Sequence, residues 1–154
     1  MASPTKDPIT CHVLDTQAGR PARGIRVRLE GPIPPSTNLH SAAQPRPNTF
    51  ESMTDDDGRV TAWLPYLSED AAGEPPLQTL VEVLEDRKGQ GSSRWTLRFD
   101  TGAYFGEENT FFPEVTVTFR VEEGQTVSVS ATSFQAKPTG YMSDIAVSAL
   151  PEGL

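Results

Sequence analysis

The chain alternates apolar and polar residues in many short segments, and this two-residue period constrains its fold more than any other feature. Ile25, Val27 and Leu29 alternate with charged residues, and residues 115–121 carry Val or Phe at every second position. Successive side chains of a β-strand point to opposite faces, so the pattern predicts strands with one buried and one solvated face. The predicted strands are residues 9–15, 24–30, 49–54, 59–64, 94–100, 114–121, 126–133 and 141–150.

Glycine and proline separate these segments. The chain has 12 Gly and 14 Pro, and residues 31–48 are rich in proline. They predict an exposed loop, because proline cannot donate a hydrogen bond to a β-ladder. Residues 55–58, Asp-Asp-Asp-Gly, predict a tight turn that joins the strands on either side into a hairpin. Short strands connected by such turns predict an all-β sandwich of seven to eight strands.

Two segments of the sequence could form short helices. Within residues 65–93, the stretch 77–84 is compatible with either a strand or a short helix, and both alternatives stay open. Residues 102–109 predict one or two helical turns. These turns end before Phe112-Pro113, because proline disfavours helix in the residue that precedes it.

Length and charge limit the classes of function. A chain of 154 residues with a net charge of −8 fits one domain, expected over residues 9–150 with an extension at 1–8 and a tail at 151–154. No run of Lys or Arg offers the basic surface that nucleic acids require, and no stretch approaches the ~20 apolar residues of a membrane span. We therefore expect neither a nucleic-acid nor a membrane partner. Residues 1–7 lack the apolar core of a secretion signal, so the expected location is the cytoplasm.

Few residues offer chemistry. Cys11 is the only cysteine, which excludes an intramolecular disulfide, and its apolar strand favours a core residue over a reactive thiol. His40 falls in the proline-rich loop, whereas His12 falls within the first strand. Residues 55–57 are acidic but lack the spacing of an EF-hand loop, and His or Cys spacings of the zinc type are absent. Neither a metal nor another cofactor is therefore expected.

Three separate sequence segments resemble those of one known family. They are ITCHVLDT followed by GRPA in residues 9–22, TDDDGR in residues 54–59, and FDTGAYF with FFPE in residues 99–114. In order and spacing they resemble the transthyretin and 5-hydroxyisourate hydrolase family over residues 8–121, with apparent insertions at 31–48 and 65–93. The resemblance implies an eight-stranded transthyretin-like sandwich with one short helix. It also implies a homo-oligomer, with edge-to-edge dimers that form a tetramer and active sites at the mouths of its central channel.

The same resemblance implies half of an active site. His12 matches the family's first-strand histidine, a general acid or base, and Arg59 matches the arginine of its D-G-R hairpin, a clamp for a planar anionic substrate. The family's second histidine, in an H-x-H strand, has no counterpart in residues 127–133, and its C-terminal Y-R-G-S is absent. The chain instead continues past Tyr141, as it does in vertebrate transthyretin, a non-enzymatic hormone carrier.

Alignment of the last two strands with the family directs further side chains into the channel beside His12, because side chains on one face of a strand recur at every second residue. Asp144 is predicted to join His12 and Arg59 as a catalytic residue by orienting the tautomer of His12. The alternative for Asp144 is a solvated strand residue. The expected substrate-binding residues are Leu14, Ala131, Ser133, Gln135, Tyr141 and Met142.

Three functions stay open. The first is a repurposed enzyme that keeps the channel and converts a small molecule by proton transfer, through cyclisation, isomerisation or hydrolysis, for instance in secondary metabolism. Retention of His12 with Arg59 favours this enzyme. The second is a 5-hydroxyisourate hydrolase of urate breakdown, against which the missing histidine counts, since loss of one member of a catalytic unit costs orders of magnitude in rate. The third is a non-catalytic small-molecule carrier, which the transthyretin-like tail favours.

Overall fold

Residues 5–33, 47–66, 77–133 and 146–152 are described by the structure, a computed structural model. Seven of the strands in this part of the chain span six residues or more, and the other three span two residues each. The strands are β1 (Ile9–Asp15), β2 (Arg20–Pro21), β3 (Arg26–Gly31), β4 (Asn48–Met53), β5 (Arg59–Val60), β6 (Leu64–Pro65), β7 (Ser93–Phe99), β8 (Val115–Val121), β9 (Thr126–Ser133) and β10 (Ala146–Glu152).

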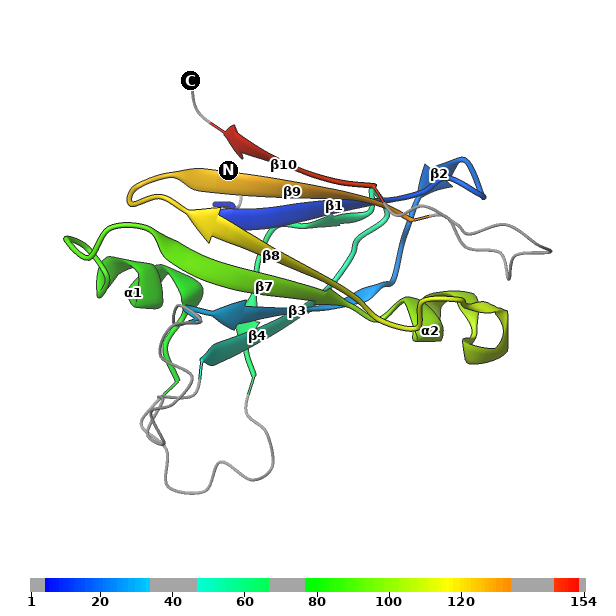
Figure 1. The fold of residues 1–154 in the computed structure, drawn as a ribbon, viewed down its shortest axis with the longest axis horizontal. Coiled ribbons are helices and arrows are strands. Elements are labelled where there is room, and N and C mark those ends of the chain that lie inside the picture. The colour runs from blue at the N-terminus through cyan, green and yellow to red at the C-terminus, as the bar shows by residue number, and fades with distance from the viewer. Residues whose placement is uncertain (1–4, 34–46, 67–76, 134–145, 153–154) are drawn as a thin grey trace.

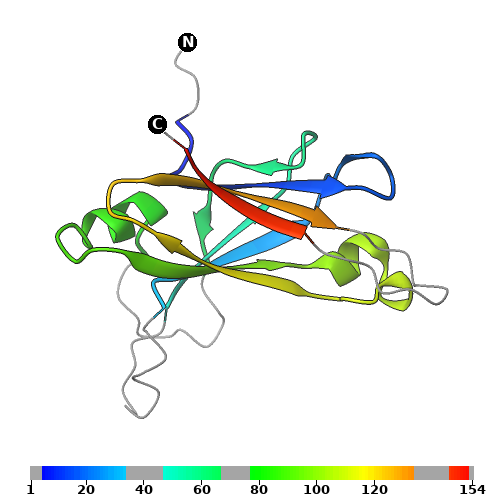
Figure 2. The same ribbon diagram turned by 45° about the horizontal axis from the view of Figure 1, so that its top comes forward.

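These strands form two five-stranded sheets that pack face to face (Figure 1). The first sheet has the order β10–β9–β1–β2, and β5 also pairs with β1; the second has the order β6–β4–β3–β7–β8. Strands β1 and β9 run parallel, whereas the other described pairs are antiparallel. Figure 2 turns the first sheet toward the viewer. The prediction of an all-β sandwich is confirmed.

The core lies between the two sheets and comes from the alternation seen in the sequence. Ile25, Val27 and Leu29 are each 0% exposed, and they belong to the same buried cluster as Trp95, Leu97 and Phe99 of β7. Removal of each such side chain from water contributes about 1.5–3 kcal/mol. The alternating residues of β8 are less deeply buried, since this strand lies at the edge of its sheet.

The predicted hairpin of residues 49–54 with 59–64 is wrong except at its far end, where Leu64 pairs with Glu51. Strand β4 pairs with β3 and β6, whereas β5 pairs with β1 of the other sheet. The chain therefore crosses between the sheets after residue 60. Trp63 explains the crossing, because its indole nitrogen donates to the carbonyl of Ile9 at 2.7 Å and its backbone N–H donates to the Asp7 carboxylate at 2.7 Å. These bonds hold the segment against the start of β1.

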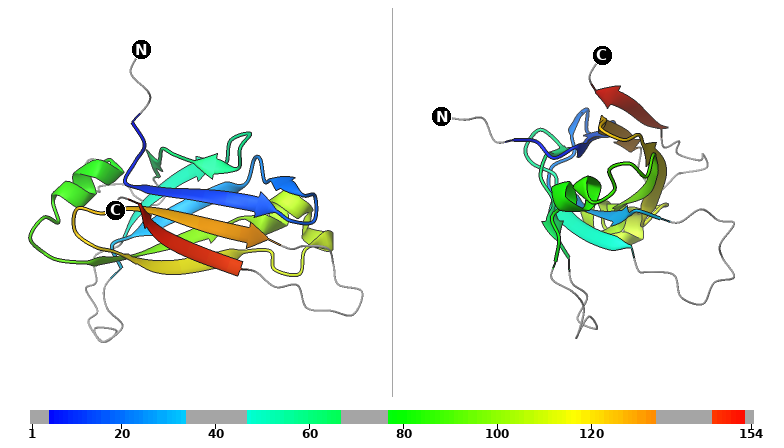
Figure 3. Two further views of the ribbon diagram at one scale, coloured as in Figure 1. Left: turned by 90° about the horizontal axis from the view of Figure 1, so that it is seen from above. Right: turned by 90° about the vertical axis from the view of Figure 1, so that its left-hand side faces the viewer.

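The open alternative in residues 77–84 resolves to a helix, α1 (Leu80–Glu85). Thr79 and Glu82 form a capping box, which satisfies backbone donors that a helix start leaves unpaired. Leu80 and Val83 are buried in the core. The predicted turns near residues 102–109 are confirmed as α2 (Thr101–Phe105) and a 3-10 helix (Glu107–Asn109). Figure 3 shows α1 and α2 at opposite ends of the sandwich.

Several predictions fall on residues that the structure does not describe. Residues 34–46 of the loop prediction, 67–76 of the insertion, and 141–145 at the start of the last predicted strand lie outside the described residues. The domain bounds 9–150 stay a prediction. In the part of the chain that is described, no helix has the length and apolarity needed to cross a membrane.

We predict that Cys11 does not react in the folded protein. Burial raises the pKa of its thiol to about 12, so almost none of it is the nucleophilic thiolate at neutral or mildly alkaline pH. An aromatic disulfide reagent at pH 8 should label no thiol in native protein and one thiol per chain in urea. Fast stoichiometric labelling without denaturant would contradict the core position of Cys11.

Candidate active site

The fold brings His12 and Arg59 together on the outer face of the first sheet. They are backbone partners in the antiparallel β1–β5 pair, and directly paired residues present their side chains on the same face. The neighbouring pair, Cys11 with Val60, is 1% exposed at each residue and faces the core. His12 is half-buried and Arg59 is exposed, so both are available to a ligand that lies on this face.

The turn before Arg59 is held rigidly by hydrogen bonds. The Asp55 carboxylate Oδ1 accepts from the backbone N–H groups of Asp57 and Arg59, each at 2.9 Å. Backbone bonds join Asp55 N–H to the Arg59 carbonyl at 2.9 Å and Gly58 N–H to the Asp55 carbonyl at 2.9 Å. The Val13 N–H then donates to the Gly58 carbonyl at 2.8 Å, which fixes the turn against β1.

Gly58 lets this turn approach β1 so closely. Its φ of +72° lies in the left-handed region, and a Cβ there would overlap the carbonyl oxygen of Val13 and lie 3.1 Å from the backbone nitrogen of Ala22. Only glycine meets both conditions. Glycine is therefore required at position 58, and the close approach that it allows determines where Arg59 lies on β5.

The same turn selects the tautomer of His12. Nε2 of the ring lies 2.9 Å from the backbone carbonyl oxygen of Asp57. A carbonyl oxygen can only accept, so Nε2 carries the hydrogen and donates it. In the neutral ring the lone pair is then on Nδ1, which is the atom that can take a proton from a ligand.

Strand β9 completes the described part of this face with hydroxyl groups. Ser128 is the backbone partner of Thr10, and Ser130 that of His12; both serines are half-buried. Leu14, 36% exposed, follows His12 on the same side, and its backbone partner is Thr132. The face therefore offers an imidazole, a guanidinium and a row of small hydroxyls.

The prediction that Ala131 lines the face beside His12 is wrong. Ala131 pairs with Val13, is 5% exposed and belongs to the core, and the backbone partner of Ser133 is Asp15 rather than Leu14. A shift of one residue exchanges the two faces of a strand, so Ser130 rather than Ala131 lies beside His12, and the role of Ser133 stays a prediction. The sequence carried the signal, because Val and Ala occupy alternate positions up to residue 131.

Four predicted site residues lie outside the described residues: Gln135, Tyr141, Met142 and Asp144. Their roles, including that of Asp144 as a catalytic residue, stay predictions. The described part of the last strand begins at Ala146, and Ser148 is the backbone partner of Ser130. Strand β10 therefore adjoins β9 beside the His12 position.

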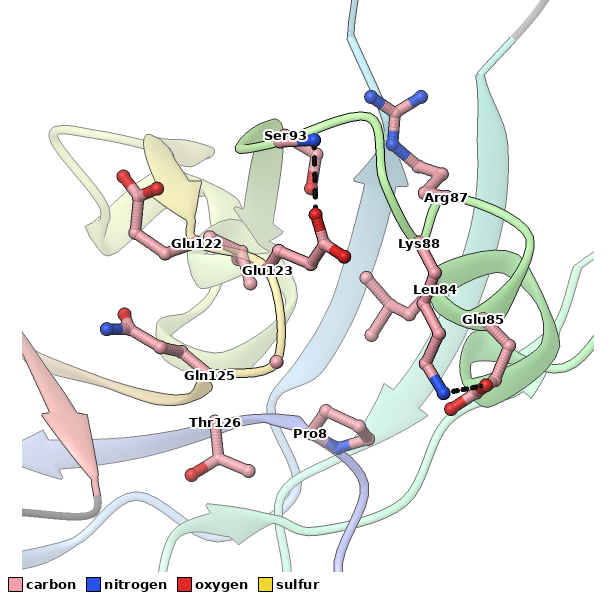
Figure 4. Close-up of a pocket in the computed structure, with 13 residues that line it drawn as sticks. Pro8, Leu84, Glu85, Arg87, Lys88, Ser93, Glu122, Glu123, Gln125 and Thr126 are labelled. Atoms are coloured by element: carbon pink, nitrogen blue, oxygen red, sulfur yellow. Dashed lines mark hydrogen bonds and ion pairs between the residues drawn. The ribbon is translucent and has the colours of Figure 1, made fainter.

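A pocket of about 200 Å³ lies elsewhere, between α1 and the turn that joins β8 to β9 (Figure 4). Pro8 and Leu84 are apolar members of its wall, and Lys88 pairs with Glu85 at 2.5 Å on its rim. Glu123 accepts from two backbone N–H groups of the loop after α1. Neither this pocket nor a second hollow beside residues 55–57 includes His12 or Arg59.

Comparison with known proteins places the chain in a family. The model of the HIUase/Transthyretin family matches residues 9–141. The chain belongs to this family. The resemblance inferred from the three sequence segments is thereby confirmed.

Relatives in the HIUase/Transthyretin family include enzymes. The chain is 33% identical over 124 residues to the uric acid degradation bifunctional protein TTL of Arabidopsis thaliana, a match that covers 79% of this chain and 31% of that protein. It thus spans less than a third of the plant protein. It is 31% identical over 123 residues to a probable 5-hydroxyisourate hydrolase of Schizosaccharomyces pombe, covering 76% of this chain and 75% of the yeast protein.

Solved structures agree on the fold. Transthyretin from Sparus aurata is 16% identical, with a TM-score of 0.57 and coverage of 95% of this chain and 98% of that chain. An (S)-allantoin synthase is 21% identical, with a TM-score of 0.53 and coverage of 94% of this chain and 43% of that chain. These likenesses show the transthyretin fold.

We predict that Gly58→Ala destabilises the protein more than Gly24→Ala. Gly24 has a φ of +79° but nothing within 4 Å of an added Cβ, so its substitution adds only left-handed strain of about 1–2 kcal/mol. Gly58→Ala adds the overlap with Val13 and should cost at least ~3 kcal/mol. Urea unfolding measures both, and equal losses would mean that the turn does not lie against β1 as described.

Proposed function

We propose that the chain is a hydrolase of uric acid degradation that acts on a urate-derived heterocycle of the 5-hydroxyisourate kind. The observation that carries this proposal is the pairing of His12 with Arg59 on the outer face of the first sheet. A proton acceptor and an anion clamp held side by side suit an anionic, planar substrate with a reactive ring carbonyl. The Arabidopsis and Schizosaccharomyces pombe relatives, described as a uric acid degradation protein and a probable 5-hydroxyisourate hydrolase, support the same class.

In the proposed reaction His12 acts through Nδ1, because Nε2 is engaged by the Asp57 carbonyl. Nδ1 takes a proton from water, and the water oxygen attacks a ring carbonyl carbon of the substrate. The ring carbon–nitrogen bond then breaks, and the imidazolium returns the proton to the leaving nitrogen. Arg59 binds the anionic edge of the substrate and stabilises the oxyanion that forms at the attacked carbonyl.

A repurposed enzyme is the second candidate, and a specific observation favours it. The backbone partners of Thr10 and His12 on β9 are Ser128 and Ser130, and residues 127–133 contain no histidine. A single imidazole beside hydroxyl groups suits an isomerisation or cyclisation in which one group both removes and returns a proton. Such a reaction would convert a different small molecule, for example in secondary metabolism, at the same face.

The exposure of the candidate residues supports a homo-oligomer. In the single chain Arg59 and Leu14 are exposed and His12 is half-buried, whereas small-molecule sites are usually concave and exclude water. A second copy laid across this face would enclose the substrate. We propose a dimer or tetramer whose copies meet over the first sheet, with a small molecule as the ligand, and the cytoplasm as the location.

We predict that the protein accelerates the decay of freshly generated 5-hydroxyisourate, followed in the ultraviolet. His12→Ala should lower kcat about 10²–10⁴-fold, because it removes the proton acceptor. Arg59→Ala should mainly raise KM, because the anion clamp is lost. Arg23→Ala is the matched control, since Arg23 is an exposed arginine that pairs with Asp56 next to the same turn.

Two outcomes would contradict these roles. No acceleration by micromolar wild-type protein would rule out the hydrolase and leave the repurposed enzyme, for which the same variants are then tested on candidate substrates. Equal kinetic losses in Arg23→Ala and Arg59→Ala would mean that Arg59 contributes only charge to the surface.

We predict that the protein is a dimer or tetramer at micromolar concentration. Leu14→Asp places a charge on the exposed face of β1 and should shift the protein toward monomer, because a buried unpaired charge opposes association. Light scattering after gel filtration measures the mass of both. An active wild-type monomer would contradict the proposed enclosure of the site by a second copy.

A further inference from the structure

One carboxylate in the turn of residues 55–58 bonds the backbone of Arg59 and the backbone of Asp57, the residue that His12 contacts. Oδ1 of Asp55 accepts from the backbone N–H of Asp57 and from that of Arg59, each at 2.9 Å. We propose that Asp55 is a positioning residue of the site, which sets the tautomer of His12 and the place of Arg59. This inference rests on the proposed function for its kinetic part only.

The link from Asp55 to His12 passes through one residue, Asp57, whose N–H and carbonyl are both bonded. The N–H of Asp57 donates to Asp55, and the carbonyl of Asp57 accepts from Nε2 of His12 at 2.9 Å. If the N–H loses its partner, the turn no longer holds this carbonyl toward the ring. The ring then loses the bond that selects hydrogen on Nε2, and Nδ1 is protonated in part of the molecules.

The link from Asp55 to Arg59 is direct. Besides the bond from Oδ1 to the Arg59 N–H, the Asp55 N–H donates to the Arg59 carbonyl at 2.9 Å. Both backbone groups of Arg59 are thus held by one residue. The strand partner His12 lies opposite, so a shift of the turn changes the separation of the two groups that would act on the substrate.

The neighbouring carboxylate shows that this arrangement is specific to Asp55. Asp56 carries the same charge in the same turn, but its carboxylate pairs with Arg23 at 2.7 Å, and both side chains are more than 70% exposed. It holds neither Arg59 nor the Asp57 peptide in any described hydrogen bond. Asp56→Asn is therefore the matched control for the loss of one negative charge.

Three substitutions separate the position of the oxygen from its charge. Asp55→Asn keeps an accepting Oδ1 at the same place without the charge, Asp55→Glu keeps the charge but moves the oxygen by one methylene, and Asp55→Ala removes both. A positioning role predicts that Asn behaves as wild type while Glu and Ala do not. A role of the charge predicts the reverse for Asn and Glu.

The decisive measurement is the nitrogen chemical shifts of the His12 ring, from long-range proton–nitrogen spectra at a pH where the imidazole is neutral. A His40→Gln background leaves His12 as the one ring to observe, since the chain has two histidines. We expect hydrogen on Nε2 in the wild type and in the Asn and Asp56→Asn variants, and a mixture of tautomers in Asp55→Glu and Asp55→Ala. In the latter two, kcat on the substrate should fall about ten- to a hundredfold and KM should rise.

Several results would overturn the proposal. They are an unchanged His12 tautomer in both Asp55→Glu and Asp55→Ala, a loss in Asp55→Asn with retention in Asp55→Glu, or an equal loss in Asp56→Asn. If Asp55→Ala does not fold, the comparison of Asn with Glu still decides. If the wild type turns over no urate-derived substrate, the proposed function fails, while the nitrogen shifts continue to report on Asp55.

Discussion

The parallel pairing of β1 with β9 determines which side chains share a face with His12. Cys11 and Val13 stand opposite Val129 and Ala131, and all four are buried between the sheets. The apolar area that these residues remove from water fixes the register, since a slip of one residue would place serines in the core and valines in solvent. The same register determines which residues lie on the outer face of these strands. The candidate site is thus specified by the core beneath it.

Much of the fold follows from local patterns that the sequence displays. The alternation of Val27 with charged neighbours is sufficient to predict a strand and the face that it buries, because one strand already contains the period. The pairing of residues 59–64 is different in kind. It depends on a bond from the Trp63 indole to the Ile9 carbonyl, across a long stretch of chain, and no local pattern encodes which sheet the segment joins.

In the candidate site, too, some features could be predicted from local sequence and others depend on the folded structure. His12 and Arg59 could be chosen from their types and surrounding motifs, and the structure places them opposite each other. The choice of Ala131 over Ser130 failed because it was taken from an alignment of the tail rather than from the alternation within β9 itself. The part played by Asp55 could not be foreseen, since an acidic turn residue is commonly solvated and its hydrogen bonds appear only when the turn is folded against β1.

This fold leaves the chemistry of the site free to change. The transthyretin and the (S)-allantoin synthase structures share the architecture, so the architecture alone does not decide between carrier and enzyme. The core side of β1 and β9 holds the register, whereas the residues of the outer face can be exchanged at little cost in stability. In this chain the face keeps an imidazole with a selected tautomer and an arginine whose backbone is held by the turn before it. A carrier does not need a fixed tautomer on this face, whereas the proposed proton transfer by His12 depends on one.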